Sequence, residues 1–231
     1  MLDNLSKYEI VLASDSPRRR ELLAGLDIHF AVKTIPDIDE SYPKTLQKEE
    51  IPVYIAKQKA QAYQKYLKDN TLLITADTIV WLDGNVYGKP KDESEAKEML
   101  RILSGKTHEV ITAVCLTGLK KQQSFHVSSK VKFAELQDEE IVYYVKKYKP
   151  FDKAGAYGVQ EWIGYIGVEK LTGSFYNVMG LPIKTLYTYL KNGNNIINYA
   201  TTDSSKSRRE NSRRFGIING FFERSCYDCG R

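Results

Sequence analysis

The stretch LASDSPRRRELL, residues 12–23, constrains the fold of this chain more than any other part of it. The apolar and β-branched run at residues 8–13 predicts a strand. The cap-type residues Ser14 and Ser16, followed by Pro17, predict the start of a helix. The stretch therefore predicts a strand, a tight turn and a helix in direct succession.

Three consecutive arginines, Arg18, Arg19 and Arg20, fall in the first turn of this predicted helix. The helix dipole and the unpaired N–H groups are positive there, so each arginine costs roughly 0.3 to 1 kcal/mol relative to an acid. A phosphate bound at the turn would convert that repulsion into attraction, because N–H groups and guanidinium groups both favour it. The pattern favours a phosphate site over the alternative, a solvated basic surface.

The length of 231 residues, with 42% hydrophobic and 27% charged residues, fits one sizeable core or two lobes around a cleft. No early apolar run resembles a signal peptide, and none reaches the roughly 18 apolar residues of a membrane span. We therefore expect a cytoplasmic protein with no membrane partner. Of the net charge of +5, residues 194–231 contribute +3, so the rest of the chain gives little support for nucleic-acid binding.

An acidic loop follows the first helix, and Asp37, Asp39 and Glu40 cluster in it. Carboxylates near the polybasic turn could hold a hard divalent cation that a bound polyphosphate also ligates, although a solvated acidic loop has the same spacing. A long helix is predicted from about Pro52, and Lys59 belongs to it. A lysine on such a helix either reaches a ligand or stays in solvent.

The apolar run TLLITADTIVWL, residues 71–82, predicts a buried strand that Asp77 interrupts. A buried carboxylate is expensive unless it is paired, binds a metal or opens onto a cleft. The alternative is an aspartate that bonds to local backbone at a strand end. Asp83-Gly84 predicts a hairpin turn, which would bring Lys89 back beside the strand as a phosphate-binding cation.

The remaining elements are predicted as a mixture of strands and helices. Strands are expected at residues 29–33, 107–116, 124–128, 130–136, 165–171 and 175–178. Helices are expected through residues 96–103 and 142–148, and a last helix should end near Asn192. His108 and His126 stand alone in no metal-ligand spacing, so no catalytic or metal role is expected for them.

The stretch DKAGAYGVQEWIG, residues 152–164, predicts a loop whose glycines let backbone approach a ligand. Gln160 in this loop offers one amide donor and one amide acceptor. These match the O4 acceptor and the N3–H donor of a uracil or thymine ring, and they do not match a purine. The alternative is an ordinary surface glutamine.

Six motifs, LASDSPRRREL, TADTIV, GKP, LSGKTHEVITAV, DKAGAYGVQ and NVMGLP, closely resemble in order and separation those of the Maf family of nucleoside triphosphate pyrophosphatases. The resemblance covers about residues 8–192. It implies an α/β fold related to inosine triphosphatase, a two-lobed mixed sheet with flanking helices and a deep central cleft. Many members are dimeric, so a homodimer is one expectation. The implied reaction converts a nucleoside triphosphate to the monophosphate and pyrophosphate with a divalent cation, Mg²⁺ or Mn²⁺, as cofactor.

The form AGAYGVQ resembles the subgroup that acts on dTTP and UTP, so we expect pyrimidine nucleoside triphosphates, modified ones included, as substrates. By the same resemblance Asp77 is the proton acceptor and Lys89 is a cleft residue, and we expect the two to form the catalytic pair. The resemblance makes Glu40 a cleft residue, and we expect Glu40 and Asp77 to hold the metal, with Asp39 as the alternative to Glu40. The substrate-binding positions that match are Arg18, Thr78 and Gln160, which are associated with substrate choice, and Ser14, Arg19 and Lys59.

Two other functions stay open at this point. Family members have also been described as inhibitors of septum formation, so a nucleotide-binding regulator without essential catalysis competes with the enzyme. A phosphatase that releases only the γ-phosphate is a weaker rival. A pure sensor could lose Asp77 and Lys89, whereas this chain retains both.

The nucleotide-binding domain is expected to span residues 1–192. Residues 193–231 depart from the family, and their Asn, Ser and Arg content predicts a disordered basic tail. Cys226 and Cys229 in this tail form a C-x-x-C pair, which is half of a zinc site without a matching pair. With Cys115 the chain has three cysteines, too few for a disulfide framework.

Overall fold

The computed structural model of the chain describes residues 2–192. Within them no helix is both long enough and apolar enough to cross a membrane. The predicted tail at residues 193–231, with Cys226 and Cys229, lies outside the described residues. The domain boundary at residue 192 therefore stays a prediction.

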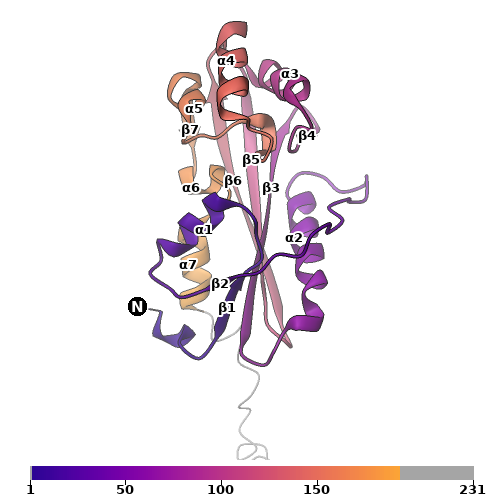
Figure 1. The fold of residues 1–231 in the computed structure, drawn as a ribbon, viewed down its shortest axis with the longest axis vertical. Coiled ribbons are helices and arrows are strands. Elements are labelled where there is room, and N and C mark those ends of the chain that lie inside the picture. The colour runs from indigo at the N-terminus through magenta and orange to yellow at the C-terminus, as the bar shows by residue number, and fades with distance from the viewer. Residues whose placement is uncertain (1, 193–231) are drawn as a thin grey trace, which may run out of the picture. The chain divides into compact units, whose positions relative to one another are not determined.

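A seven-stranded mixed sheet forms the centre of the described chain (Figure 1). Its strands are β1 (Glu9–Leu12), β2 (Ala31–Val32), β3 (Thr71–Leu82), β4 (Asn85–Tyr87), β5 (Thr107–Thr117), β6 (Gln122–Phe133) and β7 (Val168–Thr172). The strand order is β2-β1-β3-β5-β6-β7, and β4 also pairs with β3. β1 is parallel to β2 and β3, and the other pairs are antiparallel.

One edge of β3 is interrupted. Residues 71–74 pair with β1 and residues 80–82 pair with β4, while the opposite edge pairs with β5 from Leu73 to Trp81. Within the described chain, residues 75–79 therefore have a strand neighbour on one side only. The gap arises because β1 ends at Leu12 and the chain turns into a helix.

Helices cover both faces of the sheet (Figure 1). They are α1 (Pro17–Ala24), α2 (Glu50–Ala62), α3 (Glu93–Leu103), α4 (Asp138–Tyr148), α5 (Trp162–Gly167), α6 (Phe175–Val178) and α7 (Ile183–Lys191). α2 packs on one face of β3 and β5, and α1 and α7 pack on the other. α3, α4 and α5 share a further core with the opposite ends of the long strands. The strands β3, β5 and β6 thus contribute to both groups of helices, α1, α2 and α7 at one end and α3, α4 and α5 at the other. The predicted mixed α/β fold is confirmed.

The alternation of side chains along β3 explains its apolar sequence. Leu72 and Ile74 face α1 and α7, whereas Leu73 faces α2. Because helices cover both faces, nearly every position of this strand is buried. The same alternation sends Asp77 and Thr78 to opposite faces of the interrupted edge.

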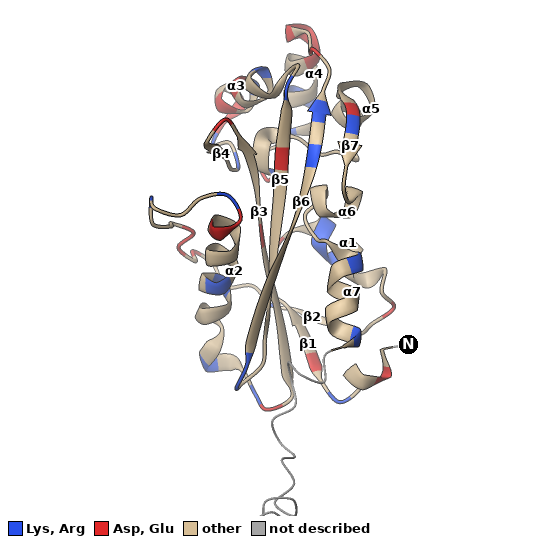
Figure 2. Ribbon diagram, turned by 180° about the vertical axis from the view of Figure 1, so that it is seen from behind, with Lys and Arg blue, Asp and Glu red and all other residues tan. Residues whose placement is uncertain are grey.

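α1 starts differently from α3 and α4. Those two helices carry acidic residues in their first turns (red in Figure 2), where the helix dipole favours them. α1 has no acid there, and its arginines follow the Ser16 cap and Pro17. The Ser16 side chain accepts a hydrogen bond from the backbone N–H of Arg19 at 3.5 Å. The predicted strand, turn and helix are confirmed. Because the first turn of α1 contains no acid, the arginines there have no acidic partner within that turn.

Two predicted strands, at residues 124–128 and 130–136, are in fact one strand, β6, which ends at Phe133. The polar residue Ser129 interrupts the apolar pattern between them. In the structure Ser129 is buried, and its hydroxyl donates to the carbonyl of Ser174 at 3.2 Å. A satisfied polar side chain therefore continues the strand where the sequence pattern indicated a break.

The strand prediction for residues 175–178 is wrong, because they form the short helix α6. The prediction for residues 165–171 is wrong in its first part, which belongs to α5, and β7 begins at Val168. The hydroxyl of Ser174 accepts from the backbone N–H of Asn177 at 3.2 Å and so caps α6. Short apolar runs fit a helix or a strand equally well, and here the cap decides.

His108 lies in the core at the start of β5 and is only 1% exposed. Its Nε2 lies 2.8 Å from the hydroxyl of Tyr157, and its ring contacts the rings of Phe133 and Tyr157 edge to face. Burial lowers the pKa of His108 to about 4, so the side chain is neutral at physiological pH. It is a core residue, whereas His126 is exposed on β6.

We expect His108 to make the protein sensitive to acid. Its pKa is lowered from 6.5 to about 4, so between these values the unfolded chain binds a proton that the folded chain excludes. The free energy of unfolding should therefore fall by about 2 kcal/mol from about pH 7.5 to about pH 5 through this residue alone. Urea denaturation of His108→Gln should show a flatter pH dependence than the wild type. The exposed-site control His126→Gln should keep the wild-type slope, and equal slopes for all three proteins would refute the role of His108.

Candidate functional site

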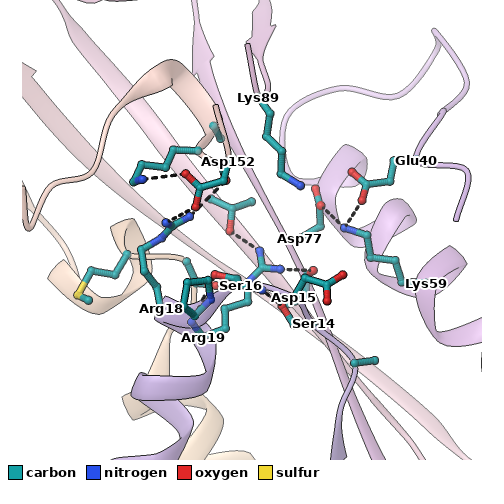
Figure 3. Close-up of a pocket in the computed structure, with 18 of the residues that line it drawn as sticks. Ser14, Asp15, Ser16, Arg18, Arg19, Glu40, Lys59, Asp77, Lys89 and Asp152 are labelled. Carbon is teal, nitrogen blue, oxygen red and sulfur yellow. Dashed lines mark hydrogen bonds and ion pairs between the residues drawn. The ribbon is translucent and has the colours of Figure 1, made fainter. Parts of the chain in front are cut away.

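A cavity of about 370 Å³ opens at the interrupted edge of β3. This volume lies in the range of small-molecule binding sites. All nine predicted site residues line it: Ser14, Arg18, Arg19, Glu40, Lys59, Asp77, Thr78, Lys89 and Gln160. Figure 3 shows most of them converging from α1, α2, β3 and the loops. The structure brings these residues together, while their chemical roles stay predictions.

Asp39, the alternative to Glu40, does not line the cavity. Its carboxylate accepts hydrogen bonds from the backbone N–H and the hydroxyl of Ser41, both at 2.8 Å. These local bonds hold the pKa of Asp39 below its usual range. Of the two acids, Glu40 is the one that reaches the cavity.

Asp77 and Glu40 share one lysine. Asp77 is 7% exposed, and its Oδ1 accepts a hydrogen bond from Lys59 Nζ at 2.8 Å. The same ammonium lies 3.0 Å from Glu40 Oε1 (Figure 3). Burial would raise the pKa of Glu40, but the hydrogen bond from Lys59 and the positive charges of Lys59, Lys89 and Arg19 together hold it below its usual value. Lys59 is therefore the partner that a carboxylate in a buried strand requires.

The arginines of α1 have different partners. Arg18 Nη1 donates to Asp152 Oδ2 at 2.8 Å, across the cavity wall. Arg20 lies away from the cavity, where its guanidinium contacts the carbonyl of Ser14 at 3.4 Å and a carboxylate oxygen of Asp15 at 3.7 Å. Only two of the three arginines, Arg18 and Arg19, line the cavity.

Arg19 ties α1 to the open edge of β3. Its Nη1 donates to the carbonyl of Ala76 and its Nε to the carbonyl of Gly180, both at 2.8 Å. Its Nη2 donates to Thr78 Oγ1 at 3.0 Å. The Ala76 carbonyl lies where β3 lacks a neighbour, so the guanidinium supplies the donor that an adjacent strand would otherwise provide. Three of its five N–H groups thus have protein acceptors, and Arg19 has a structural function beside any contact with a ligand.

The neighbours of Thr78 determine in which hydrogen bonds its hydroxyl group donates and in which it accepts. Thr112 donates its only hydroxyl proton to the carbonyl of Asn177 at 2.9 Å. It must therefore accept from Thr78, whose Oγ1 lies 2.9 Å away. Thr78 in turn accepts from Arg19. With its proton used, Thr78 can only accept a hydrogen bond from a ligand, a restriction that the sequence did not reveal.

Gln160 provides an unpaired acceptor. Its Oε1 is buried, and it has no hydrogen-bond partner among the described residues. A buried acceptor left in this state costs about 1 to 3 kcal/mol. A ligand with a suitably placed N–H group would remove that cost. The side chain therefore fits the predicted role of reading a donor on a bound molecule.

Lys89 and Ser14 add donors to the cavity. Lys89 follows β4, and its ammonium extends toward Asp77 in Figure 3. Its positive charge also contributes to the lowered pKa of Glu40. Ser14 Oγ accepts from the backbone N–H of Ser16 at 3.2 Å, which fixes the hydroxyl at the start of α1. The cavity thus combines cations and hydroxyl groups suited to an anion.

Glu40 and Asp77 form a donor set that fits a divalent cation shared with a ligand. Mg²⁺ is commonly held by one or two carboxylates together with phosphate oxygens. The two carboxylates approach a common point, the Lys59 ammonium, within 3.0 Å. In residues 2–192 no group of three His, Cys, Asp or Glu side chains converges. A cation here would therefore need further oxygens from the bound molecule.

Sequence reasoning missed three charged residues near the cavity, Asp152, Lys153 and Glu161. Burial alone would raise the pKa of Asp152, but hydrogen bonds from Lys153 and Arg18 keep it below its usual range. The sequence did contain a signal for two of them, since Asp152 and Lys153 stand side by side at the start of the glycine-rich loop. Charged side chains need partners when such a loop packs against a cleft.

Comparisons with known proteins cover nearly all of the described residues. A family model described as Maf-like protein matches residues 9–193. The dTTP/UTP pyrophosphatase of Phocaeicola vulgatus is 62% identical over 191 residues, 83% of this chain and 99% of that protein. The protein of the same name from Bacteroides thetaiotaomicron is 61% identical over the same shares. Among solved structures, the Staphylococcus aureus Ham1 protein matches with a TM-score of 0.46 and 20% identity, covering 80% of this chain and 99% of that one.

We expect Arg19 to be required for stability and Arg20 to be dispensable. Arg19→Met removes three hydrogen bonds and leaves the Ala76 and Gly180 carbonyls without these donors, so the free energy of unfolding should fall by about 3 kcal/mol. Arg20→Met removes a side chain that is 43% exposed, and the change should stay within about 0.5 kcal/mol. Urea denaturation compares the two variants, and equal stability would contradict this account of Arg19.

Proposed function

The chain belongs to the Maf-like protein family, and from that premise we propose that it hydrolyses dTTP and UTP to the nucleoside monophosphate and pyrophosphate. The observation that supports this most directly is the composition of the cavity. A buried aspartate, several cations and an unpaired glutamine carbonyl meet at one open strand edge. These are the groups needed to activate water, bind phosphates and select a base.

Asp77 is the proton acceptor in this proposal. Water attacks the α-phosphorus, the bond from that phosphorus to the bridging oxygen breaks, and pyrophosphate leaves. Lys59 holds Asp77 through Oδ1, so the other carboxylate oxygen can take the proton of the attacking water. The position of Asp77 on a buried strand fixes it more firmly than a loop would.

The cations of the cavity neutralise the triphosphate. Arg18 and Lys89 line the cavity together with the first turn of α1, whose N–H groups favour anions. Arg19 supports this turn through its bonds to β3. Hydrolysis of this kind depends mainly on positioning and charge neutralisation, so no covalent nucleophile is required.

Mg²⁺ or Mn²⁺ is the proposed cofactor. Glu40 and Asp77 would hold it together with phosphate oxygens. When bound, it would offset phosphate charge and polarise the phosphoryl group that water attacks. Lys59 would remain beside both carboxylates and limit their mutual repulsion.

Gln160 is proposed to select the base. Its buried Oε1 would accept from the N3–H of uracil or thymine, and its amide would donate to O4. Cytosine presents the opposite pattern at these two positions, so it should be disfavoured. Modified pyrimidines that keep both groups should be accepted.

The cellular setting is proposed from family membership. Nucleoside triphosphates are cytoplasmic metabolites, so we propose a cytoplasmic enzyme, and the dimers that the family resemblance implies lead us to propose a homodimer. The competing function, a nucleotide-sensing regulator of septum formation, needs binding without catalysis. Asp77 and Lys89 both line the cavity, an arrangement that supports the enzyme.

We expect Asp77→Asn to lose turnover by about 100- to 10,000-fold, because the amide cannot accept the proton of water. Binding of UTP, followed by calorimetry, should stay measurable. Asp83→Asn is the matched control, since it makes the same change in the exposed turn that follows the same strand and should keep wild-type activity.

The products decide between the candidate functions. UMP with pyrophosphate supports the proposal, whereas UDP with phosphate would identify a γ-phosphatase. Wild-type turnover by Asp77→Asn would reject Asp77 as the base. Binding without turnover in the wild type would favour the regulator.

We also expect Gln160→Leu to lower kcat/KM for UTP by about 100-fold and to affect CTP much less, because both hydrogen bonds to the uracil edge are lost. The exposed Gln123→Leu serves as the control and should change neither value. Steady-state kinetics with the two nucleotides test this. An unchanged preference for UTP over CTP would show that another residue reads the base.

A further inference from the structure

The side chains of Tyr144 and Glu161 contact the turn that carries Gln160. Glu161 N donates to the carbonyl of Gly158 at 3.0 Å and closes the turn. Gly158 N donates to the hydroxyl of Tyr144 at 3.0 Å, and this hydroxyl donates to Glu161 Oε2. A Cβ atom at Gly158 would lie 2.8 Å from Glu161 Cδ, so the carboxylate is folded directly against the turn. The orientation of Gln160 thus depends on where the Glu161 carboxylate is held.

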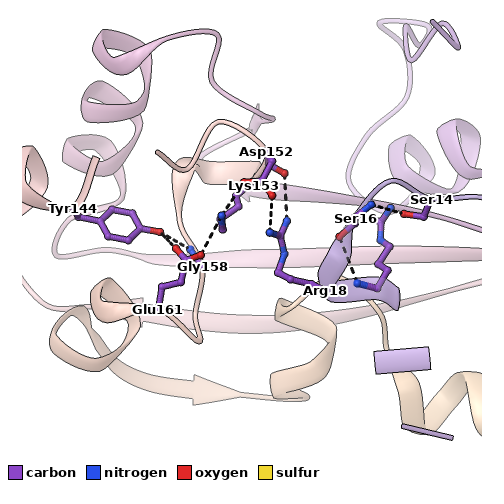
Figure 4. A network of polar contacts seen from close by, with 9 residues as sticks. Ser14, Ser16, Arg18, Tyr144, Asp152, Lys153, Gly158 and Glu161 are labelled. Carbon is purple, nitrogen blue, oxygen red and sulfur yellow. Dashed lines mark hydrogen bonds and ion pairs between the residues drawn. The ribbon is translucent and has the colours of Figure 1, made fainter. Parts of the chain in front are cut away.

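Lys153 holds that carboxylate from the other side. Its Nζ lies 3.1 Å from Glu161 Oε1 and 2.8 Å from Asp152 Oδ1, and its side chain is only 9% exposed (Figure 4). A buried ammonium group is stable only when such partners surround it. Lys153 therefore links two carboxylates that lie on different sides of the loop.

Asp152 extends the link to α1. Its Oδ2 accepts from Arg18 Nη1 at 2.8 Å, and its backbone carbonyl accepts from Arg18 Nη2 at 3.3 Å. The charges alternate along the series Arg18, Asp152, Lys153 and Glu161, and Tyr144 ends it at α4. One polar network thereby joins Arg18 to the turn that carries Gln160.

We propose that Lys153 is a positioning residue for base selection, which sets the placement of the Gln160 turn relative to Arg18 through Glu161 and Asp152. This inference rests on the proposed function, because it assigns base selection to the same cavity. Lys153 need not touch the base, since it acts through its two carboxylate partners. Within residues 2–192, Asp77 and Lys59 make no hydrogen bond or ion pair with this network and form a separate group with Glu40.

Loss of Lys153 should loosen base selection and leave the chemical step largely intact. Without the ammonium, the Asp152 and Glu161 carboxylates lose their shared counterion, and Glu161 can move away from the turn. Gln160 then meets the uracil edge in several orientations, and small displacements of a recognition group reduce its effect. The penalty should appear in KM for UTP more than in kcat.

The test compares UTP and CTP hydrolysis by the wild type, Lys153→Met, Lys153→Arg and Lys146→Met. Lys153→Met should lower the ratio of kcat/KM for UTP to that for CTP by about tenfold, with kcat for UTP within about twofold of the wild type. Lys153→Arg keeps the charge and should recover part of the ratio. Lys146→Met, at an exposed position of α4, should leave the ratio unchanged.

A second variant covers the case in which Lys153→Met does not fold, as judged by thermal unfolding. Asp152→Asn changes a residue whose side chain is 52% exposed and weakens the ion pairs to both Lys153 and Arg18, so it should lower the same ratio. An unchanged ratio in a folded Lys153→Met or Asp152→Asn variant, or equal losses for the two nucleotides, would overturn the inference while the proposed function stands. A wild type without UTP hydrolysis would overturn the proposed function, and the inference with it.

Discussion

The guanidinium group of Arg19 makes an interrupted strand edge possible, and the rest of the site depends on that edge. β1 separates from β3 after four residue pairs, and such a separation leaves backbone carbonyls of the longer strand without partners. Arg19 donates to the Ala76 carbonyl at the gap and to Gly180 before α7. One side chain thereby joins α1, β3 and the segment before α7. Where the cavity opens into the sheet, this side chain supplies the hydrogen-bond donor that a neighbouring strand would have given to the Ala76 carbonyl.

The pleat of β3 divides the work of the site between two faces. Asp77 points toward α2, where it forms with Lys59 and Glu40 the ion-pair group that we propose to activate water. Thr78, the next residue, points to the opposite face, where it accepts a hydrogen bond from Arg19 and donates one to Thr112. Neighbouring residues of one strand thus serve different groups, because successive side chains alternate. The Asp77–Lys59–Glu40 group and the Thr78–Arg19 group thus share a cavity without sharing hydrogen-bond partners.

Local patterns could be predicted from the sequence, and remote contacts could not. The cap and proline before α1, the buried run of β3 and the family motifs identified nine site residues, and all nine line the cavity. The pairing of Arg18 with Asp152 joins positions 134 residues apart, so no local pattern reveals it. The choice of Glu40 over Asp39 likewise depends on bonds within the loop. The helix at residues 175–178 was missed because its cap, rather than its apolar content, decides its structure.

The lysine between Glu40 and Asp77 has a consequence for the order in which ligands arrive. Lys59 is a counterion attached to the chain, 3.0 and 2.8 Å from the two carboxylates. A divalent cation that arrives alone has to compete with this resident charge, and it gains less than it would from two unpaired carboxylates. A cation that arrives on a polyphosphate already has much of its charge balanced. If the proposed cofactor is used, Lys59 would therefore favour uptake of metal and nucleotide as one complex over stepwise loading of a bare metal.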